Sequence, residues 1–155
     1  MLNNDVLRSV RYMLDISDSG MVDIFSLVDY RVELADVVDF LRAEDEEGFL
    51  EIPDQAMLYF LNGLVIHLRG KNDKQPEVPV KLPNSNNLML KKLRVAFNLK
   101  DEDLQDILKS VDFNVSKPEL SAFFRAKGHS NYRACGDQFL RNFLKGLTQR
   151  VRPTA

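Results

Sequence analysis

The chain contains an internal repeat that constrains every further reading of it. When the sequence is shifted by 83 residues against itself, residues 3–69 align with residues 86–152 without a gap, and 20 of the 67 aligned positions are identical. Ordinary amino-acid composition would give about 4 identities by chance. Two copies of one unit therefore make up most of the 155 residues, and both copies are expected to share one fold.

The apolar residues of each copy recur with a helical period. Stripes at positions i, i+3, i+4 and i+7 mark the first two helices of each copy: Val6, Leu7, Val10 and Leu14 with Met89, Leu90, Leu93 and Phe97, then Met21, Ile24, Phe25 and Val28 with Leu104, Ile107, Leu108 and Val111. A short third helix is predicted around residues 37–41 and 120–124, and a fourth over residues 55–68 and 138–151. The predicted fold class is all-α, a tandem duplication of a four-helix unit.

A proline-containing segment joins the two copies. Residues 70–85 include Pro76, Pro79 and Pro83, and proline disfavours helix. The predicted organisation is therefore an acidic repeat at residues 1–69, a linker at 70–85 and a basic repeat at 86–152. The two repeats could form two separate domains joined by the linker. A unit of about 68 residues has only a marginal core, which favours two repeats that pack together as one body.

Several polar residues are identical in both copies. Arg11 and Arg94 flank the apolar stripe of the first helix, and Asp23 and Asp106 lie on the second. Our hypothesis is that Arg11–Asp23 and Arg94–Asp106 ion pairs connect these helices, since the planar guanidinium suits a bidentate carboxylate contact.

Other repeated residues are interpreted as structural. Asp18 and Asp101 stand where an N-cap oxygen is needed for the second helix. Gly63 and Gly146 lie inside the fourth helices, where glycine costs about 1 kcal/mol relative to alanine. Close approach of two helices is the predicted reason for these glycines.

The net charge of −2 hides an uneven distribution. Residues 1–70 carry 5 Lys/Arg and 14 Asp/Glu, a net charge of −9, whereas residues 71–155 carry 16 Lys/Arg and 9 Asp/Glu, a net charge of +7. Such asymmetry indicates a macromolecular partner, a head-to-tail contact between molecules, or one half folding against the other.

The second repeat is predicted to carry a nucleic-acid-binding face. The candidate residues are Lys91, Lys92, Lys117, Arg125, Lys127, Arg133, Arg141 and Lys145. Basic clusters interleaved with aromatic residues, here Phe124 and Tyr132, are typical of contact with a phosphate backbone. The helix order also resembles a helix-turn-helix weakly, although the turn at residues 112–114 lacks glycine and is longer than usual. The alternative is that this face packs on the acidic first repeat.

No familiar catalytic or metal-binding arrangement is predicted. Zinc needs three or four converging ligands, and Cys135, His67 and His129 share no ligand spacing. The acidic run at residues 44–47 lacks the alternating oxygen ligands of a calcium loop. Cys135 precedes the last helix, but its counterpart Ile52 indicates a partly buried apolar position. We expect no metal, no cofactor and no enzymatic activity.

The expected setting is the cytoplasm, without a membrane. The single cysteine cannot form an internal disulfide, no window approaches the 18 or so apolar residues of a membrane span, and the first residues lack the apolar core of a secretion signal.

Several longer segments of the sequence resemble those of a known protein family. The opening residues 3–12, residues 44–49, residues 60–64 and residues 135–141 together resemble the YehS-like family of small bacterial proteins over nearly the full length. The resemblance implies a two-repeat bacterial protein of unknown function, so it supplies no catalytic or binding residues.

The predicted function is regulatory, with nucleic-acid binding through the second repeat. The alternative is a protein–protein interaction module in which complementary acidic and basic halves meet, either in salt-sensitive self-association or on an acidic protein surface.

Overall fold

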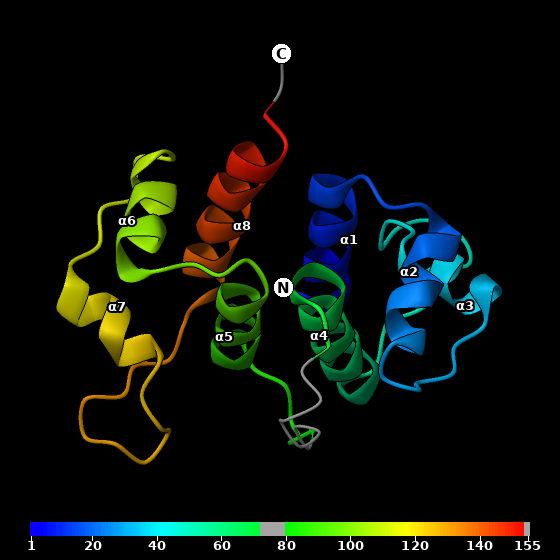
Figure 1. Ribbon diagram of the computed structural model, residues 1–155, viewed down its shortest axis with the longest axis horizontal. Helices are drawn as coiled ribbons and strands as arrows, with labels where there is room; N and C mark the ends of the chain where they lie inside the picture. Colours follow the sequence, from blue (N-terminus) through cyan, green and yellow to red (C-terminus); the bar gives the residue numbers. More distant parts are fainter. Residues whose placement is uncertain (72–79, 154–155) are drawn as a thin grey trace.

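The computed structural model describes residues 1–71 and 80–153, and within these residues the chain forms eight helices and no strand (Figure 1). The helices of the first repeat are α1 (Asn3–Leu14), α2 (Asp18–Ser26), α3 (Leu34–Phe40) and α4 (Asp54–Arg69). Those of the second are α5 (Asn86–Ala96), α6 (Asp101–Lys109), α7 (Lys117–Phe123) and α8 (Asp137–Val151). The predicted all-α fold and its duplication are confirmed. Half of the predicted linker, residues 72–79, lies outside the described residues.

Serine side chains begin several helices. Ser17 accepts a hydrogen bond from the backbone N–H of Gly20 at the start of α2, and Ser116 forms a capping box with Glu119 at the start of α7. The sequence assignment of Asp18 and Asp101 as N-caps was therefore one residue late. Both are the first residues of their helices, where a carboxylate interacts favourably with the helix dipole.

Helices from both repeats form the centre of the molecule. α1 packs beside α8, and α4 packs beside α5. Because α1 corresponds to α5 and α4 corresponds to α8, exchanging the repeats exchanges these two pairs, so the arrangement has an approximate two-fold symmetry. The remaining helices, α2 with α3 and α6 with α7, lie at opposite ends of the molecule (Figure 1).

The hydrogen bonds between the repeats follow the same symmetry. The Arg152 guanidinium donates to the carbonyl oxygen of Tyr12 at 2.8 Å, and its counterpart Arg69 donates to that of Val95 at 3.2 Å. At the other end of each pair, Asp137 accepts from the amine of Met1 at 2.9 Å, as Asp54 does from the backbone N–H of Asn84 at 3.1 Å. The two helices of each pair therefore run parallel.

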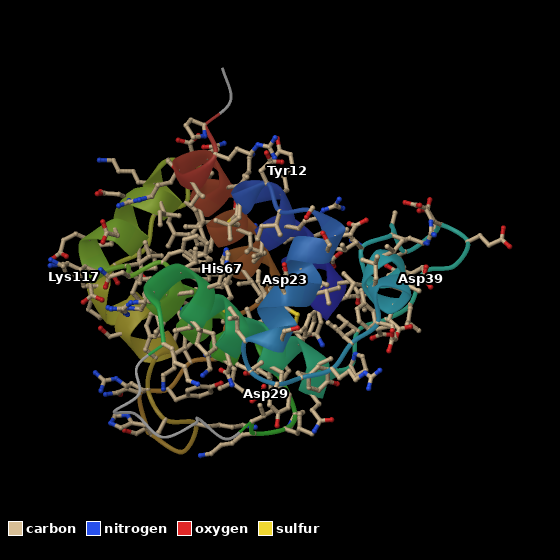
Figure 2. All side chains as sticks on the ribbon, turned by 45° about the vertical axis from the view of Figure 1, so that its right-hand side comes forward. Tyr12, Asp23, Asp29, Asp39, His67 and Lys117 are labelled. Atoms are coloured by element: carbon tan, nitrogen blue, oxygen red, sulfur yellow. The ribbon has the colours of Figure 1, made fainter. Side chains whose placement is uncertain are left out.

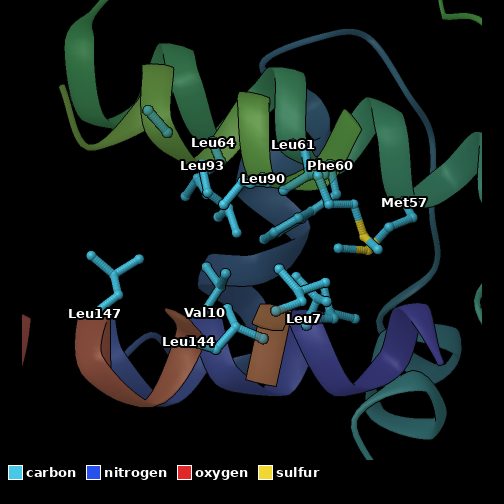
Figure 3. Packing of buried hydrophobic residues seen from close by; sticks show 14 of the residues in the cluster. Leu7, Val10, Met57, Phe60, Leu61, Leu64, Leu90, Leu93, Leu144 and Leu147 are labelled. Atoms are coloured by element: carbon cyan, nitrogen blue, oxygen red, sulfur yellow. The ribbon is translucent and has the colours of Figure 1, made fainter. Parts of the chain in front are cut away.

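The central core lies between the α1–α8 pair and the α4–α5 pair (Figure 3). It is filled by aliphatic and aromatic side chains of all four helices. Those labelled in the figure are Leu7, Val10, Met57, Phe60, Leu61, Leu64, Leu90, Leu93, Leu144 and Leu147, all of them buried. Burying one such side chain contributes about 1.5–3 kcal/mol. Since each repeat supplies two of these four helices, both repeats share one hydrophobic core.

Two glycines let the outer helices approach the centre. A Cβ atom on Gly63 of α4 would overlap the carbonyl oxygen of Ile24 on α2, and one on Gly146 of α8 would overlap that of Ile107 on α6. The predicted reason for these glycines, close helix approach, is confirmed in both repeats.

Candidate functional site

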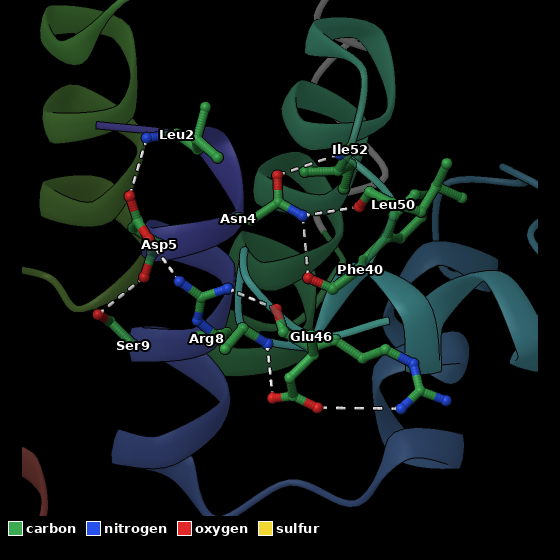
Figure 4. Close-up of polar contacts among 11 residues, drawn as sticks. Leu2, Asn4, Asp5, Arg8, Ser9, Phe40, Glu46, Leu50 and Ile52 are labelled. Atoms are coloured by element: carbon green, nitrogen blue, oxygen red, sulfur yellow. Dashed lines mark hydrogen bonds and ion pairs between the residues drawn. The ribbon is translucent and has the colours of Figure 1, made fainter. Parts of the chain in front are cut away.

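A buried asparagine positions the loop that follows the third helix. In the first repeat the Nδ2 group of Asn4 donates to the carbonyl oxygens of Phe40 and Leu50, each at 2.9 Å, and its Oδ1 accepts from the N–H of Ile52 at 3.1 Å (Figure 4). Asn4 is fully buried, and all three of these bonds are made inside the protein. The loop of residues 41–53 is thereby tied to α1.

The second repeat has the same arrangement. Asn87 donates to the carbonyl oxygens of Phe123 at 3.1 Å and Arg133 at 2.9 Å, and accepts from the N–H of Cys135 at 2.8 Å. The two asparagines occupy equivalent positions of the repeats, and no role was predicted for them from the sequence. The available signal was a polar residue kept in both copies on the first turn of an otherwise amphipathic helix.

In the first repeat, acidic side chains neutralise the cations beside this loop. The Nε atom of Arg42 lies 2.9 Å from Oδ1 of Asp39, and its Nη1 lies 4.0 Å from Oε2 of Glu46. Arg8 is paired with Asp5 and donates to the carbonyl oxygen of Arg42 at 2.7 Å. Arg42 and Arg8, the cations beside the loop of residues 41–53, therefore have their counter-charges within the first repeat.

The second repeat keeps a cation at each of these two positions, but other residues replace the carboxylates that pair with them in the first repeat. Arg125 corresponds to Arg42, but Ala122 and His129 stand at the positions of Asp39 and Glu46. Likewise Lys91 replaces Arg8, and Leu88 replaces its partner Asp5.

Most cations on and around α7 of the second repeat lack a counter-charge. Among the residues that the structure describes, Lys91, Lys117, Arg125 and Lys127 are exposed and take part in no ion pair. Arg133 lies 3.8 Å from Glu119 and its guanidinium sits 5.9 Å from the ring centre of Phe123. We call Lys91, Lys117, Arg125, Lys127 and Arg133 the basic end.

A shallow hollow lies on the basic end. It has a volume of about 610 Å³ and is lined by Lys117, Pro118, Ser121, Arg125 and Asn131. Figure 2 labels Lys117 at one end of the molecule and Asp39 at the other, so the basic end and the acidic loop of the first repeat are far apart.

The predicted nucleic-acid-binding residues do not form one surface. Arg141 and Lys145 lie on α8 and line a groove against α1, and they are not part of the basic end. Lys92 is half-buried, and this burial, together with the charge of Lys91, lowers the pKa of its ammonium group.

The hypothesis of Arg11–Asp23 and Arg94–Asp106 ion pairs was wrong. Arg11 pairs with Asp18 at 3.1 Å and Arg94 pairs with Asp101 at 2.8 Å. Each arginine reaches across the short α1–α2 or α5–α6 turn, where its Nε also donates to the carbonyl oxygen of Ile16 or Leu99. The first residue of the next helix meets the guanidinium there, whereas Asp23 and Asp106 lie further along and are exposed.

The α6–α7 connection is longer than that of a helix-turn-helix. α6 ends at Lys109 and α7 begins at Lys117, so residues 110–116 separate two helices that three or four residues would join in that motif. The helix order thus gives no support for a reading helix in the major groove.

The chemistry of Cys135 is that of a buried thiol. Burial and, secondarily, the charge of Asp137 raise the pKa of Cys135 to about 12, so the thiol stays protonated at neutral pH. Within residues 1–71 and 80–153, no three His, Cys, Asp or Glu side chains are grouped so that they could hold a metal ion. Nor does this part of the chain contain a helix with the length and apolar character needed to cross a membrane.

Comparison with known proteins agrees with the resemblance found in the sequence. The model of a family described as "Protein of unknown function (DUF1456)" matches residues 3–70 and again residues 86–152. The uncharacterized protein YehS of Escherichia coli (strain K12) is 47% identical over 150 residues, which cover 97% of this chain and 96% of the relative. No solved structure matches. The chain belongs to the DUF1456 family, and each of its two repeats is one copy of the family's domain.

Proposed function

We propose that this protein binds nucleic acid through the basic end, in a function that involves binding without catalysis. The observation that carries the proposal is the comparison of Arg42 with Arg125. Both are placed by the same fold, yet Arg42 has Asp39 and Glu46 as partners, whereas the corresponding positions beside Arg125 hold Ala122 and His129. The fold does not require this loss, and cations without counter-ions repel one another.

A phosphate backbone would supply the missing negative charges. Lys and Arg contacts to phosphates release condensed counter-ions, which gives binding that falls steeply with salt and depends little on sequence. The short α7 and the long α6–α7 connection offer no element suited to reading base edges. The proposed contact is therefore mainly with phosphates, and base identity should matter little.

Fluorescence anisotropy of a labelled 20-base-pair DNA duplex and a labelled single-stranded RNA, titrated over a series of salt concentrations, tests the proposal. The test variant carries Lys117→Ala, Arg125→Ala and Lys127→Ala. The control carries Arg31→Ala, Lys100→Ala and Lys109→Ala, which remove the same charge outside the basic end. If all three test residues contact phosphates on DNA, the slope of log K against log salt should flatten by about two to three units, because each contact contributes about 0.9.

Two results would contradict the proposal. One is the absence of binding to either nucleic acid at low salt. The other is an equal loss of affinity and slope in the test and control variants, since this would mean that only the net charge of the protein matters.

Head-to-tail association is the second candidate function. It is supported by the position of the acidic loop, with Glu44, Asp45, Glu47 and Glu51 exposed, at the end of the molecule opposite to the basic end (Figure 1). Sedimentation velocity without nucleic acid distinguishes the two. Association at low salt that disappears at high salt, and that the same triple variant abolishes, would favour this candidate.

A further inference from the structure

The α1–α8 contact contains a groove of about 500 Å³, a size within the range of small-ligand sites. Along α8 it is lined by Arg141, Lys145, Gln149 and Arg152, and along α1 by Asp5 and Tyr12, among others. None of these residues except Arg141 and Lys145 was singled out from the sequence as a binding residue.

The groove breaks the symmetry of the fold. Several of these positions are apolar in the symmetry-related α4–α5 pair: Leu58 for Arg141, Val65 for Thr148, Ile66 for Gln149, Leu88 for Asp5 and Val95 for Tyr12. Others stay polar there, with Lys92 for Ser9, Asn62 for Lys145 and Arg69 for Arg152. The fold can therefore join two parallel helices here with aliphatic side chains. Polar and charged residues at the α1–α8 contact are not needed for packing.

The charges that face the groove are not balanced. Asp5 is paired with Arg8 and accepts from the backbone N–H of Leu2, and Asp137, near the start of the groove, is held by Asn86 and the amine of Met1. Arg152 lies 3.6 Å from Asp15. Within the described part of the chain, Arg141 and Lys145 are the groove cations without an ion pair within 4 Å, and Asp137, one helical turn before Arg141, is the carboxylate whose charge Arg141 acts on.

These two cations can act on one anion. They are four residues apart on α8, so their Cβ atoms are about 6 Å apart on the same helix face. A guanidinium offers a planar fork for two phosphate oxygens and the ammonium group adds a point charge.

The far end of the groove offers a flat aromatic surface. Tyr12 is 50% exposed, and the guanidinium of Arg152 lies over one face of its ring, 4.4 Å from the ring centre, while donating to the Tyr12 carbonyl oxygen. Arg152 follows Lys145 by seven residues, a rise of about 10 Å along the helix axis. This length would let a ligand place its phosphate at Lys145 and an aromatic or apolar body at Tyr12.

We infer that the α1–α8 groove binds a small phosphate ester with a flat apolar body, held by Arg141 and Lys145 at the phosphate and by Tyr12 at the body. This site is separate from the basic end and does not depend on the proposed nucleic-acid binding.

Isothermal titration calorimetry of the full chain at low salt tests the inference with three probes: AMP, adenosine and inorganic phosphate. AMP should bind more tightly than either of the others. Arg141→Gln and Lys145→Gln should each weaken AMP binding by about tenfold or more, the usual effect of losing a charged hydrogen bond. Tyr12→Val, which introduces the residue found at the equivalent position 95, should weaken AMP binding and leave phosphate binding unchanged.

Matched variants identify the cause of any loss. Arg150→Gln removes the same charge from α8 at a residue that faces Asp103 on α6, and it should leave AMP binding unchanged. The Lys117, Arg125 and Lys127 triple variant should also bind AMP normally, which separates this site from the basic end. No heat from any probe at millimolar concentration would overturn the inference. So would unchanged AMP affinity in the Arg141 and Lys145 variants, or an equal loss in Arg150→Gln.

Discussion

The two loop-holding asparagines make the same hydrogen bonds in different surroundings, and this difference gives a quantitative test. Replacing Asn4 by alanine would leave the carbonyl oxygens of Phe40 and Leu50 and the N–H of Ile52 without the partner seen in the structure. Asn4 is fully buried, so water cannot easily replace it. An unsatisfied buried polar group costs about 1–3 kcal/mol, and three groups with some relaxation should cost about 3–6 kcal/mol.

The equivalent Asn87→Ala change should cost less. Asn87 is partly accessible, and its acceptor Arg133 is exposed, so water can satisfy part of what the side chain leaves. We expect a loss of about 1–3 kcal/mol. The total free energy of unfolding of a domain is about 5–15 kcal/mol, so Asn4→Ala should remove a large part of it.

Urea unfolding followed by circular dichroism at 222 nm measures both losses. With an m value of about 2 kcal/mol/M, a loss of 4 kcal/mol lowers the midpoint by about 2 M. Asn142→Ala is the control, because Asn142 donates only to the Gln138 carbonyl oxygen of its own helix. The reasoning is refuted if Asn4→Ala costs under 1 kcal/mol, or if Asn87→Ala costs as much as Asn4→Ala.

Three further outcomes follow from the structure. Gly63→Ala and Gly146→Ala should each destabilise the fold by about 1–3 kcal/mol in urea unfolding despite the higher helix propensity of alanine, because the added Cβ meets backbone; no loss would mean that the helices separate easily. Cys135 should react with a thiol reagent at neutral pH much more slowly in the folded than in the urea-unfolded protein, and equal rates would show that the thiol is accessible. A hydrogen bond from Asn86, followed by one from the Met1 amine, lowers the pKa of Asp137. The ionised carboxylate therefore stabilises the fold above its usual pKa near 4, and this contribution disappears as the pH falls further. Asp137→Asn should flatten the acid dependence of the urea midpoint, and an unchanged profile would contradict the assignment.

The helices could be predicted from the sequence because the same helical pattern of apolar residues occurs in both copies. Ile24 and Ile107, or Gly63 and Gly146, are each ambiguous alone, but their repetition at one spacing indicates a structural role. The pairing of helices between repeats is a different kind of information. The stripe that contains Leu7 and Val10 shows that one face of α1 is buried and does not indicate that α8 lies beside it.

The site residues were predicted less well, for physical reasons that can be named. Arg11 was assigned to Asp23 because both residues are identical in the two copies, yet the short turn after α1 brings Asp18 closer. Lys145 and Lys127 look alike as basic residues of one repeat, but α8 directs Lys145 to the groove beside α1. Identity between copies reveals that a residue matters, and the reach of its side chain across a particular turn decides its partner.

A duplicated fold also provides its own reference for function. Asn4 and Asn87 hold their loops in the same way, so differences between equivalent loop positions are not imposed by the backbone. Two of the regions that differ between the repeats carry cations that have no counterpart ion pair: Arg125 lacks the carboxylates that Arg42 has, and Arg141 stands where Leu58 packs in the other pair. Cations without an ion pair in both regions are the reason to look for phosphate-bearing partners first, namely a polymer at the basic end and a small molecule in the α1–α8 groove.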